Sequence, residues 1–233
     1  MYRKWIIYQL IFYAIKSVYE ILQPIHFLCS MQTVKAIIFD LGGVLLDIDF
    51  RLTEKAFAHL GVSNFTSLFN QFHSNALFKK LETGVDEELF YDEFRTETGL
   101  SLTDEQIRDA WNALLLDFRL ESLAVLPVLR SKYQLYLLSN TNEIHLQEFQ
   151  RRYALLGKDE NFDALFDAAY YSHRIGERKP NASAFEYVLN KHRLDPATTL
   201  FIDDSINNIE AAAALGIQTV HLLPGMKVEE LGL

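Results

Sequence analysis

The stretch Val34–Asp40, VKAIIFD, decides the fold class of this chain. It is an apolar run of strand length that ends in an aspartate, and Gly42 and Gly43 follow closely. Short, continuously apolar runs are typical of strands that are buried on both faces of a parallel sheet. Four more such runs follow along the chain, at Gln134–Ser139, Ala168–Ser172, Thr199–Asp203 and Gln218–Leu222. The sequence therefore predicts five parallel strands.

Helical periodicity separates most of these runs. Leu123, Leu126 and Leu129 recur at helical spacing before the second run. The alanine-rich stretch Ile209–Leu215 precedes Gly216, a residue that commonly ends a helix. Strands that alternate with helices indicate right-handed crossover connections. The expected fold class is α/β, a doubly wound (Rossmann-like) parallel sheet.

A long segment without a convincing strand, residues 50–120, interrupts this alternation. It shows four helical patches: Leu52–Leu60, Phe65–Leu81, Glu87–Thr96 and Asp104–Phe118. The last patch begins with a predicted capping box of Thr103 and Gln106. This segment is far longer than a crossover requires. We expect it to be an inserted small helical cap domain, with residues 31–49 and 121–233 forming the core domain.

Residues 1–30 form an apolar, aromatic extension ahead of the core. Lys16 and Glu20 inside the apolar run are costly in hydrocarbon, and Pro24 interrupts a helix. We favour Met31 as the true start, with residues 1–30 as upstream sequence. An additional soluble helix is the next alternative, and a membrane anchor is the least favoured.

Composition narrows the possible partners. The net charge of −9 argues against a general nucleic-acid binder, because phosphate backbones require basic patches. A small phosphorylated substrate needs only local cations and remains compatible. The single cysteine, Cys29, permits no intrachain disulfide, which fits a cytoplasmic protein. No membrane partner is expected unless the extension is genuine, and the chain is expected to be a monomer or homodimer.

Polar residues follow the predicted strands where ligands bind in open α/β sheets, beyond the carboxyl ends. Asp40 can act as a nucleophile that forms an aspartyl-phosphate. Asp203 and Asp204 can join it in holding Mg²⁺, which prefers hard oxygen ligands. For the phosphoryl group, the sequence offers Ser139, Asn140 and the positive charge of Lys179, and Gly42 and Gly43 allow the backbone to turn close to it.

Four segments together resemble the haloacid dehalogenase (HAD) superfamily: IIFDLGGVLLD, LYLLSNTN, GERKPNASAFEYVL and LFIDDSINNIEAAAALGI. SNTNEIH and FIDDSINNIEAA are especially similar to a bacterial sugar-phosphatase branch that includes α-D-glucose-1-phosphate phosphatases. The resemblance implies a Mg²⁺-dependent phosphatase acting on a small phosphorylated metabolite, with a sugar phosphate as one candidate. It further implies these roles: Asp40 as nucleophile and metal ligand, Asp204 as metal ligand, Asp203 as support for a metal-bound water, the Gly42 carbonyl facing the metal, and Ser139, Asn140 and Lys179 as phosphate contacts.

The sequence departs from this pattern at Gly42, where most phosphatases of the superfamily carry an acid/base aspartate. Three interpretations stay open: a substrate with a good leaving group, a substitute carboxylate such as Asp47 or Asp49, or a weakly active or non-catalytic binding protein. A metal-independent 2-haloacid dehalogenase is a further alternative. Against it, the adjacent carboxylates of Asp203 and Asp204 repel each other without a cation.

Other polar residues receive a weaker assignment. His145, His173 and His221 show no metal-ligand spacing, so we interpret them as packing or surface residues. Phe78, Lys80, Glu82 and Thr83 surround a predicted loop before Gly84. If that loop faces the catalytic aspartate, it selects the substrate.

Overall fold

The structure is a computed structural model that describes residues 34–62, 81–82, 84, 86–157 and 161–233. The extension of residues 1–30, the proposed start at Met31 and nearly all of the predicted helix Phe65–Leu81 lie outside the described residues. So do Phe78, Lys80 and Thr83 of the predicted loop.

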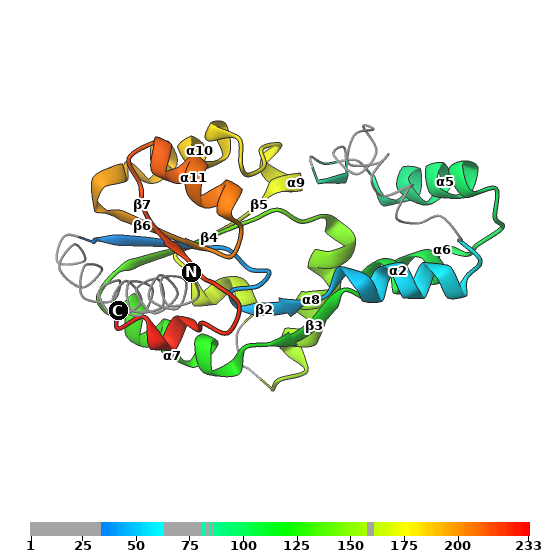
Figure 1. Ribbon diagram of the computed structural model, residues 1–233, viewed down its shortest axis with the longest axis horizontal. Helices are drawn as coiled ribbons and strands as arrows, with labels where there is room; N and C mark the ends of the chain where they lie inside the picture. The colour runs from blue at the N-terminus through cyan, green and yellow to red at the C-terminus, as the bar shows by residue number, and fades with distance from the viewer. Residues whose placement is uncertain (1–33, 63–80, 83, 85, 158–160) are drawn as a thin grey trace, which may run out of the picture.

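The described elements alternate between strand and helix along most of the chain (Figure 1). The strands are β1 (Ala36–Phe39), β2 (Leu46–Ile48), β3 (Leu115–Phe118), β4 (Gln134–Ser139), β5 (Ala168–Tyr171), β6 (Thr199–Asp203) and β7 (Gln218–His221). The helices are α2 (Phe50–His59), α5 (Glu87–Thr98), α6 (Asp104–Asn112), α7 (Leu120–Arg130), α8 (Glu143–Ala154), α9 (Ser172–Ile175), α10 (Ala182–His192) and α11 (Ile206–Ala214). Short 3-10 helices lie at Phe162–Leu165 (η2), Pro196–Thr198 (η3) and Val228–Glu230 (η4).

Five strands form one parallel sheet in the order β5-β4-β1-β6-β7. These are the five strands that the sequence predicted, with ends that differ by no more than two residues. The first strand pairs with β4 on one side and with β6 on the other, so it lies at the centre of the sheet. The α/β doubly wound fold is confirmed.

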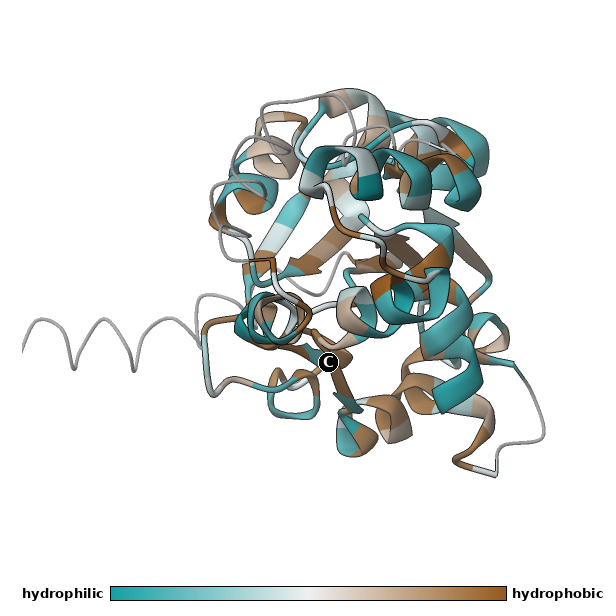
Figure 2. Cartoon of the chain, turned by 90° about the vertical axis from the view of Figure 1, so that its right-hand side faces the viewer, coloured by the Kyte–Doolittle hydropathy of each residue, from teal (hydrophilic) through white to brown (hydrophobic). Residues whose placement is uncertain are grey.

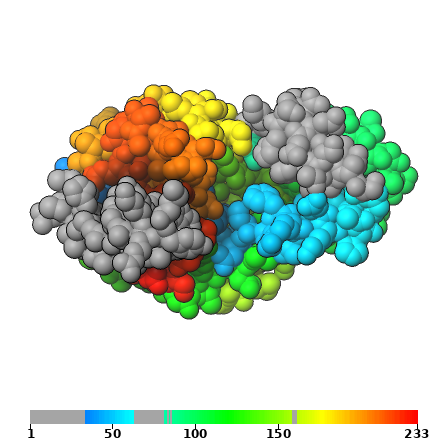
Figure 3. Space-filling model, in the orientation of Figure 1, coloured from blue at the N-terminus to red at the C-terminus, as the bar shows by residue number. Residues whose placement is uncertain are grey.

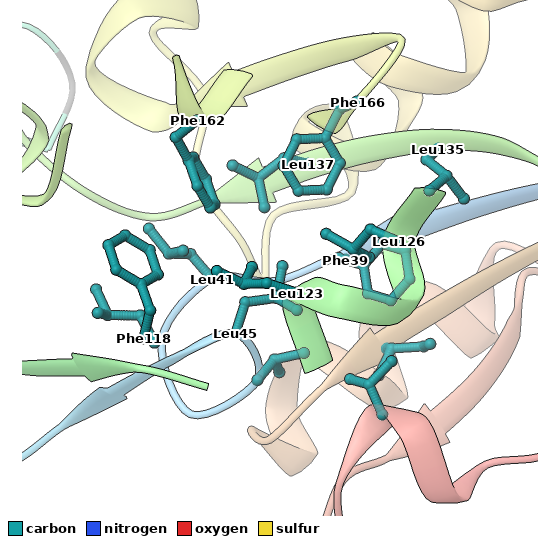
Figure 4. Close-up of a cluster of buried hydrophobic side chains, with 14 of the residues drawn as sticks. Phe39, Leu41, Leu45, Phe118, Leu123, Leu126, Leu135, Leu137, Phe162 and Phe166 are labelled. Atoms are coloured by element: carbon teal, nitrogen blue, oxygen red, sulfur yellow. The ribbon is translucent and has the colours of Figure 1, made fainter. Parts of the chain in front are cut away.

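Successive side chains of β1 point to opposite faces of the sheet, as the pleat requires. On one face, Ile37 and Phe39 pack with α7 and α8, in the cluster that Figure 4 shows. On the other face, Ala36 and Ile38 pack with α10 and α11. Figure 2 shows much brown on the strands of the sheet, whereas the helices carry both teal and brown residues. Helices on both faces explain why the strands are continuously apolar.

The prediction of no strand between residues 50 and 120 is wrong. Leu115–Phe118 forms β3, which pairs antiparallel with β2, and α6 ends at Asn112 rather than at Phe118. Local sequence favours a helix through this apolar run, but pairing with β2, a strand much earlier in the chain, overrides that preference. The β2–β3 ribbon connects the core sheet to the helical segment.

The helical segment has its own apolar cluster, which includes Phe57 of α2, Phe90 and Phe94 of α5, and Ile107 and Trp111 of α6. In Figure 3 these helices form a lobe (cyan and green) beside the core. The predicted capping box is present: Thr103 and Gln106 each accept a hydrogen bond from the backbone N–H of the other. The inserted helical cap is thus part of the observed fold, and its exact limits of 50–120 stay a prediction. Among the described residues, no helix is both long and apolar enough to cross a membrane.

Candidate active site

A buried lysine lies between two aspartates where the strands of the sheet end. The Nζ atom of Lys179 is 2.8 Å from Oδ1 of Asp40 and 2.7 Å from Oδ2 of Asp203. Asp40 directly follows β1 and Asp203 ends β6, the neighbouring strand, so the parallel pairing brings the two carboxylates together. The side chain of Lys179 is only 1% exposed, and that of Asp203 is fully buried.

Asp203 is held by several donors besides Lys179. The backbone N–H of Ser205 donates to its Oδ1 at 2.7 Å, and Nδ2 of Asn208 lies 3.1 and 3.0 Å from its two oxygens. Both carboxylate oxygens therefore already accept hydrogen bonds from protein groups. This environment suits a supporting role better than direct contact with a substrate.

The three aspartates concentrate negative charge around this lysine. Ligand atoms of Asp40, Asp203 and Asp204 all lie within 4.8 Å of one another. Burial and the negative charge of Asp203 raise the pKa of Asp40 to about 7, against the opposing positive charge of Lys179. Burial and the charge of Asp203 also raise the pKa of Asp204. One lysine thus does not offset the charge of three carboxylates.

Burial alone lowers the pKa of Lys179, but attraction to Asp40 and Asp203 outweighs it, and the pKa of this ammonium stands above its usual value. Lys179 is therefore a permanent positive charge at the site. Its position is fixed through its own backbone: Nδ2 of Asn140 donates to the Lys179 carbonyl at 2.7 Å, and the Lys179 N–H donates to Oδ1 of Asn140 at 2.9 Å.

The side chain of Asn140 is thus committed to holding the lysine loop, and only its backbone N–H is left as the predicted phosphate donor. Ser139, the last residue of β4, borders the same pocket as Asp40 and Asp204. The turn after β4 also caps a helix, because Asn142 is the N-cap of α8 and accepts from the N–H of His145. A helix N-terminus directed at this loop favours an anion there.

Gly43 permits Asp204 to approach the loop after β1. Its φ is +71°, and a Cβ atom on this residue would lie 2.1 Å from Oδ2 of Asp204. No side chain larger than hydrogen fits at this position while Asp204 stays in place.

An apolar side chain lies close to the position of the missing acid/base residue. A Cβ atom on Gly42 would lie 3.0 Å from Cδ1 of Ile48, a residue of β2. The strand that sequence reasoning did not predict therefore places a methyl group close to the residue at which most phosphatases of the superfamily carry an aspartate.

The structure does not bring Asp47 or Asp49 to the site. Oδ1 of Asp47 accepts from Nε of Arg119 at 2.7 Å, and Asp49 caps α2 and pairs with Arg51. Neither lines the pocket that contains Asp40, whereas Leu46 and Ile48, the neighbours of Asp47 in β2, do line it. Alternation along the strand turns Asp47 away from the pocket.

The pocket itself is a cavity of about 370 Å³ between the core and the cap. Asp40, Ser139 and Asp204 lie at its base, and its walls include Trp111 of α6 and His145 of α8. An ion pair links the two lobes at its border, with Nε of Arg178 2.7 Å from Oε2 of Glu82. Glu82 belongs to the predicted loop before Gly84.

Sequence reasoning missed His145, Trp111 and Ile48 as residues of this pocket. No spacing signal distinguishes them, because each resembles an ordinary packing residue in its own element. Asn208, which from the sequence could brace this loop or serve only the helix, contacts both carboxylate oxygens of Asp203.

The donor set fits Mg²⁺. The ligands offered by Asp40, Asp203 and Asp204 are carboxylate oxygens, which Mg²⁺ prefers, and Lys179 leaves much of their charge without compensation. Asp40 and Asp204 would hold the ion, with the Gly42 carbonyl as a further candidate and Asp203 as support for a bound water.

Together, this fold and site define a hydrolase of the haloacid dehalogenase type. A family model of haloacid dehalogenase-like hydrolases matches residues 34–216, and the chain belongs to that family. The superfamily predicted from the sequence is confirmed, and so is the predicted enzyme class, a HAD-like phosphatase.

Two of the similar proteins are phosphatases that match along most of their length. The chain is 33% identical over 191 residues to a D-ribitol-5-phosphate phosphatase of Bacteroides thetaiotaomicron, covering 80% of this chain and 90% of the relative. It is 27% identical to a sesquiterpene phosphatase of Aspergillus oryzae, covering 82% and 90%.

Solved structures agree with this assignment. A HAD family enzyme from Bacteroides thetaiotaomicron superposes with a TM-score of 0.80 at 33% identity, covering 86% of this chain and 98% of that one. A further structure of the wild-type form, in complex with magnesium and inorganic phosphate, gives a TM-score of 0.75 at 33% identity and covers 82% and 96%.

Proposed function

We propose that this protein is a Mg²⁺-dependent phosphatase that hydrolyses a small phosphorylated polyol or sugar through an aspartyl-phosphate on Asp40. One observation carries the proposal: Asp40, Asp203 and Asp204 surround the buried ammonium of Lys179 at the base of a pocket. The magnesium and phosphate found in the solved structure of a relative support the choice of cofactor.

The residues divide the chemistry between them. An oxygen of the Asp40 carboxylate attacks phosphorus and the bond from phosphorus to the ester oxygen breaks. The leaving group departs as an oxyanion that takes a proton from solvent, and the phosphoryl group is carried on Asp40. Water then attacks this phosphorus, which releases inorganic phosphate and restores the carboxylate. Lys179, Ser139 and the Asn140 N–H stabilise the phosphoryl oxygens. Bound Mg²⁺ would supply charge neutralisation, so that an anionic nucleophile and an anionic substrate can meet.

The pocket limits the substrate. Its volume of about 370 Å³ suits a small metabolite rather than a polymer. Because the likeness to the D-ribitol-5-phosphate phosphatase extends over most of both chains, D-ribitol 5-phosphate is the first substrate to test.

The leaving alcohol receives no proton from residue 42, because Gly42 has no ionisable side chain. General acid catalysis is typically worth about 10²–10⁴ in rate. We therefore expect good leaving groups to be hydrolysed markedly faster than simple alkyl phosphates.

The test uses two aspartate variants and p-nitrophenyl phosphate. Asp40→Asn should lower turnover by at least about 1,000-fold, because it removes the nucleophile. EDTA should abolish turnover, and added Mg²⁺ should restore it. Asp47→Asn is the matched control, because that carboxylate lies outside the pocket and pairs with Arg119.

Activity that survives both Asp40→Asn and EDTA contradicts the proposed function. A selective loss on poor leaving groups in Asp47→Asn would instead return the acid/base role to Asp47, as first hypothesised from the sequence.

A further inference from the structure

His145 lies where the core meets the cap. It is the third residue of α8, which begins after the turn that follows β4, and it borders the pocket that contains Asp40. It is only 7% exposed, so its imidazole is almost enclosed by protein.

The cap holds this imidazole in place from α6. Nδ1 of His145 is 2.8 Å from Oδ1 of Asn112, and the ring stacks on Trp111 with centroids 5.1 Å apart and planes 12° from parallel. Two contacts from successive residues of one helix fix both the position and the rotation of the ring.

These contacts also fix the tautomer. The amide oxygen of Asn112 accepts only, so Nδ1 of His145 carries the proton and donates it to the bond. Burial lowers the pKa of His145 to about 3, which keeps the ring neutral. Nε2 is then an unprotonated acceptor, and within the described part of the chain it meets no hydrogen-bond partner.

We propose that Nε2 of His145 accepts a hydrogen bond from a hydroxyl group on the organic part of the substrate. His145 is thus a specificity-determining residue that selects hydroxylated phosphate esters over apolar ones. The pocket wall also includes Ile48, Leu114 and Leu115, which offer a hydroxyl group no partner, so the acceptor on His145 favours a substrate that carries a hydroxyl group. This inference rests on the proposed phosphatase function and names the substrate feature that the site recognises.

The test compares substrates that differ only in their hydroxyl groups. D-ribitol 5-phosphate and n-pentyl phosphate have the same carbon chain length, and glycerol 3-phosphate and n-propyl phosphate form a second such pair. The wild-type enzyme should show the higher kcat/KM for the hydroxylated member of at least one pair.

Two substitutions separate the two ring nitrogens. His145→Asn keeps an amide near the position of Nδ1 and removes the acceptor at Nε2, whereas His145→Gln keeps a polar group near Nε2. Both lose the stack on Trp111, so the difference between them isolates the acceptor. We expect His145→Asn to raise KM for the hydroxylated ester by about 3- to 10-fold, the loss of one neutral hydrogen bond. KM for the alkyl ester and for p-nitrophenyl phosphate should stay within about 2-fold in that variant, and His145→Gln should retain part of the preference.

His59→Phe is the control, because His59 is an exposed residue of α2 outside the pocket. Equal effects of His145→Asn on hydroxylated and alkyl esters would show a purely structural role and overturn the inference. A wild-type preference for the alkyl member of both pairs would overturn it as well. Both results would leave the phosphatase proposal standing, which fails only if Asp40→Asn and EDTA leave turnover intact.

Discussion

Gly43→Ala tests how closely Asp204 must approach the loop after β1. Alanine at the observed φ of +71° is strained by about 1–2 kcal/mol. In addition, its Cβ would lie 2.1 Å from Oδ2 of Asp204, closer than real Cβ contacts at 3.0 Å or more, so the carboxylate must move by almost 1 Å. A displacement of about 1 Å among reacting groups can cost about 100-fold in rate. We expect a loss of that size in kcat for p-nitrophenyl phosphate, together with a higher Mg²⁺ concentration for half-maximal activity.

Gly99→Ala separates the two effects. Gly99 has a φ of +68°, and a Cβ atom there meets nothing within 4 Å, so this variant carries the backbone strain without the clash. Urea unfolding should show that Gly99→Ala is about 1–2 kcal/mol less stable than the wild type because of the backbone strain. Its turnover and its Mg²⁺ dependence should stay at the wild-type level. The reasoning is refuted if Gly43→Ala loses no more activity than Gly99→Ala.

Three further predictions follow from the same site. Lys179→Met should destabilise the protein by about 3–5 kcal/mol in urea unfolding and abolish turnover, because it leaves two carboxylates buried without their cation; an unchanged midpoint would contradict this. The pKa of His145 lies near 3 in the folded protein and near 6.5 when unfolded, so below pH 6.5 only the unfolded state takes up the proton and stability falls with decreasing pH, by up to about 1.4 kcal/mol per unit. His145→Asn should remove this contribution to the pH dependence of stability between pH 6 and 4. An equally steep fall of stability in that variant would exclude His145 as the cause. Gly42→Asp should lose about 1–3 kcal/mol through overpacking against Ile48, and adding Ile48→Ala should recover stability. If the carboxylate introduced in this double variant acts as a general acid, turnover of alkyl phosphates should rise by at least about 10-fold. No rise would show that a carboxylate at residue 42 does not act as a general acid even when Ile48 is truncated.

The core of the fold could be predicted because its signals are local. A strand buried on both faces must be apolar along its whole length, and VKAIIFD and the four later runs meet that condition. The capping box of Thr103 and Gln106 and the end of α11 before Gly216 are likewise set by adjacent residues. In contrast, Leu115–Phe118 is a strand only because β2 pairs with it, and nothing within the run itself indicates this.

The sequence by itself determined which residues with catalytic chemistry follow which strands: Asp40, Ser139, Lys179, Asp203 and Asp204. It could do so because parallel strands bring their carboxyl ends to one edge, so order along the chain predicts proximity. Only the tertiary structure decided what surrounds them. It placed Ile48 against Gly42, turned Asp47 toward Arg119, and set His145 against Trp111 and Asn112. Those contacts join elements of the core, the ribbon and the cap, and their geometry depends on how separate elements pack rather than on any pattern within one of them.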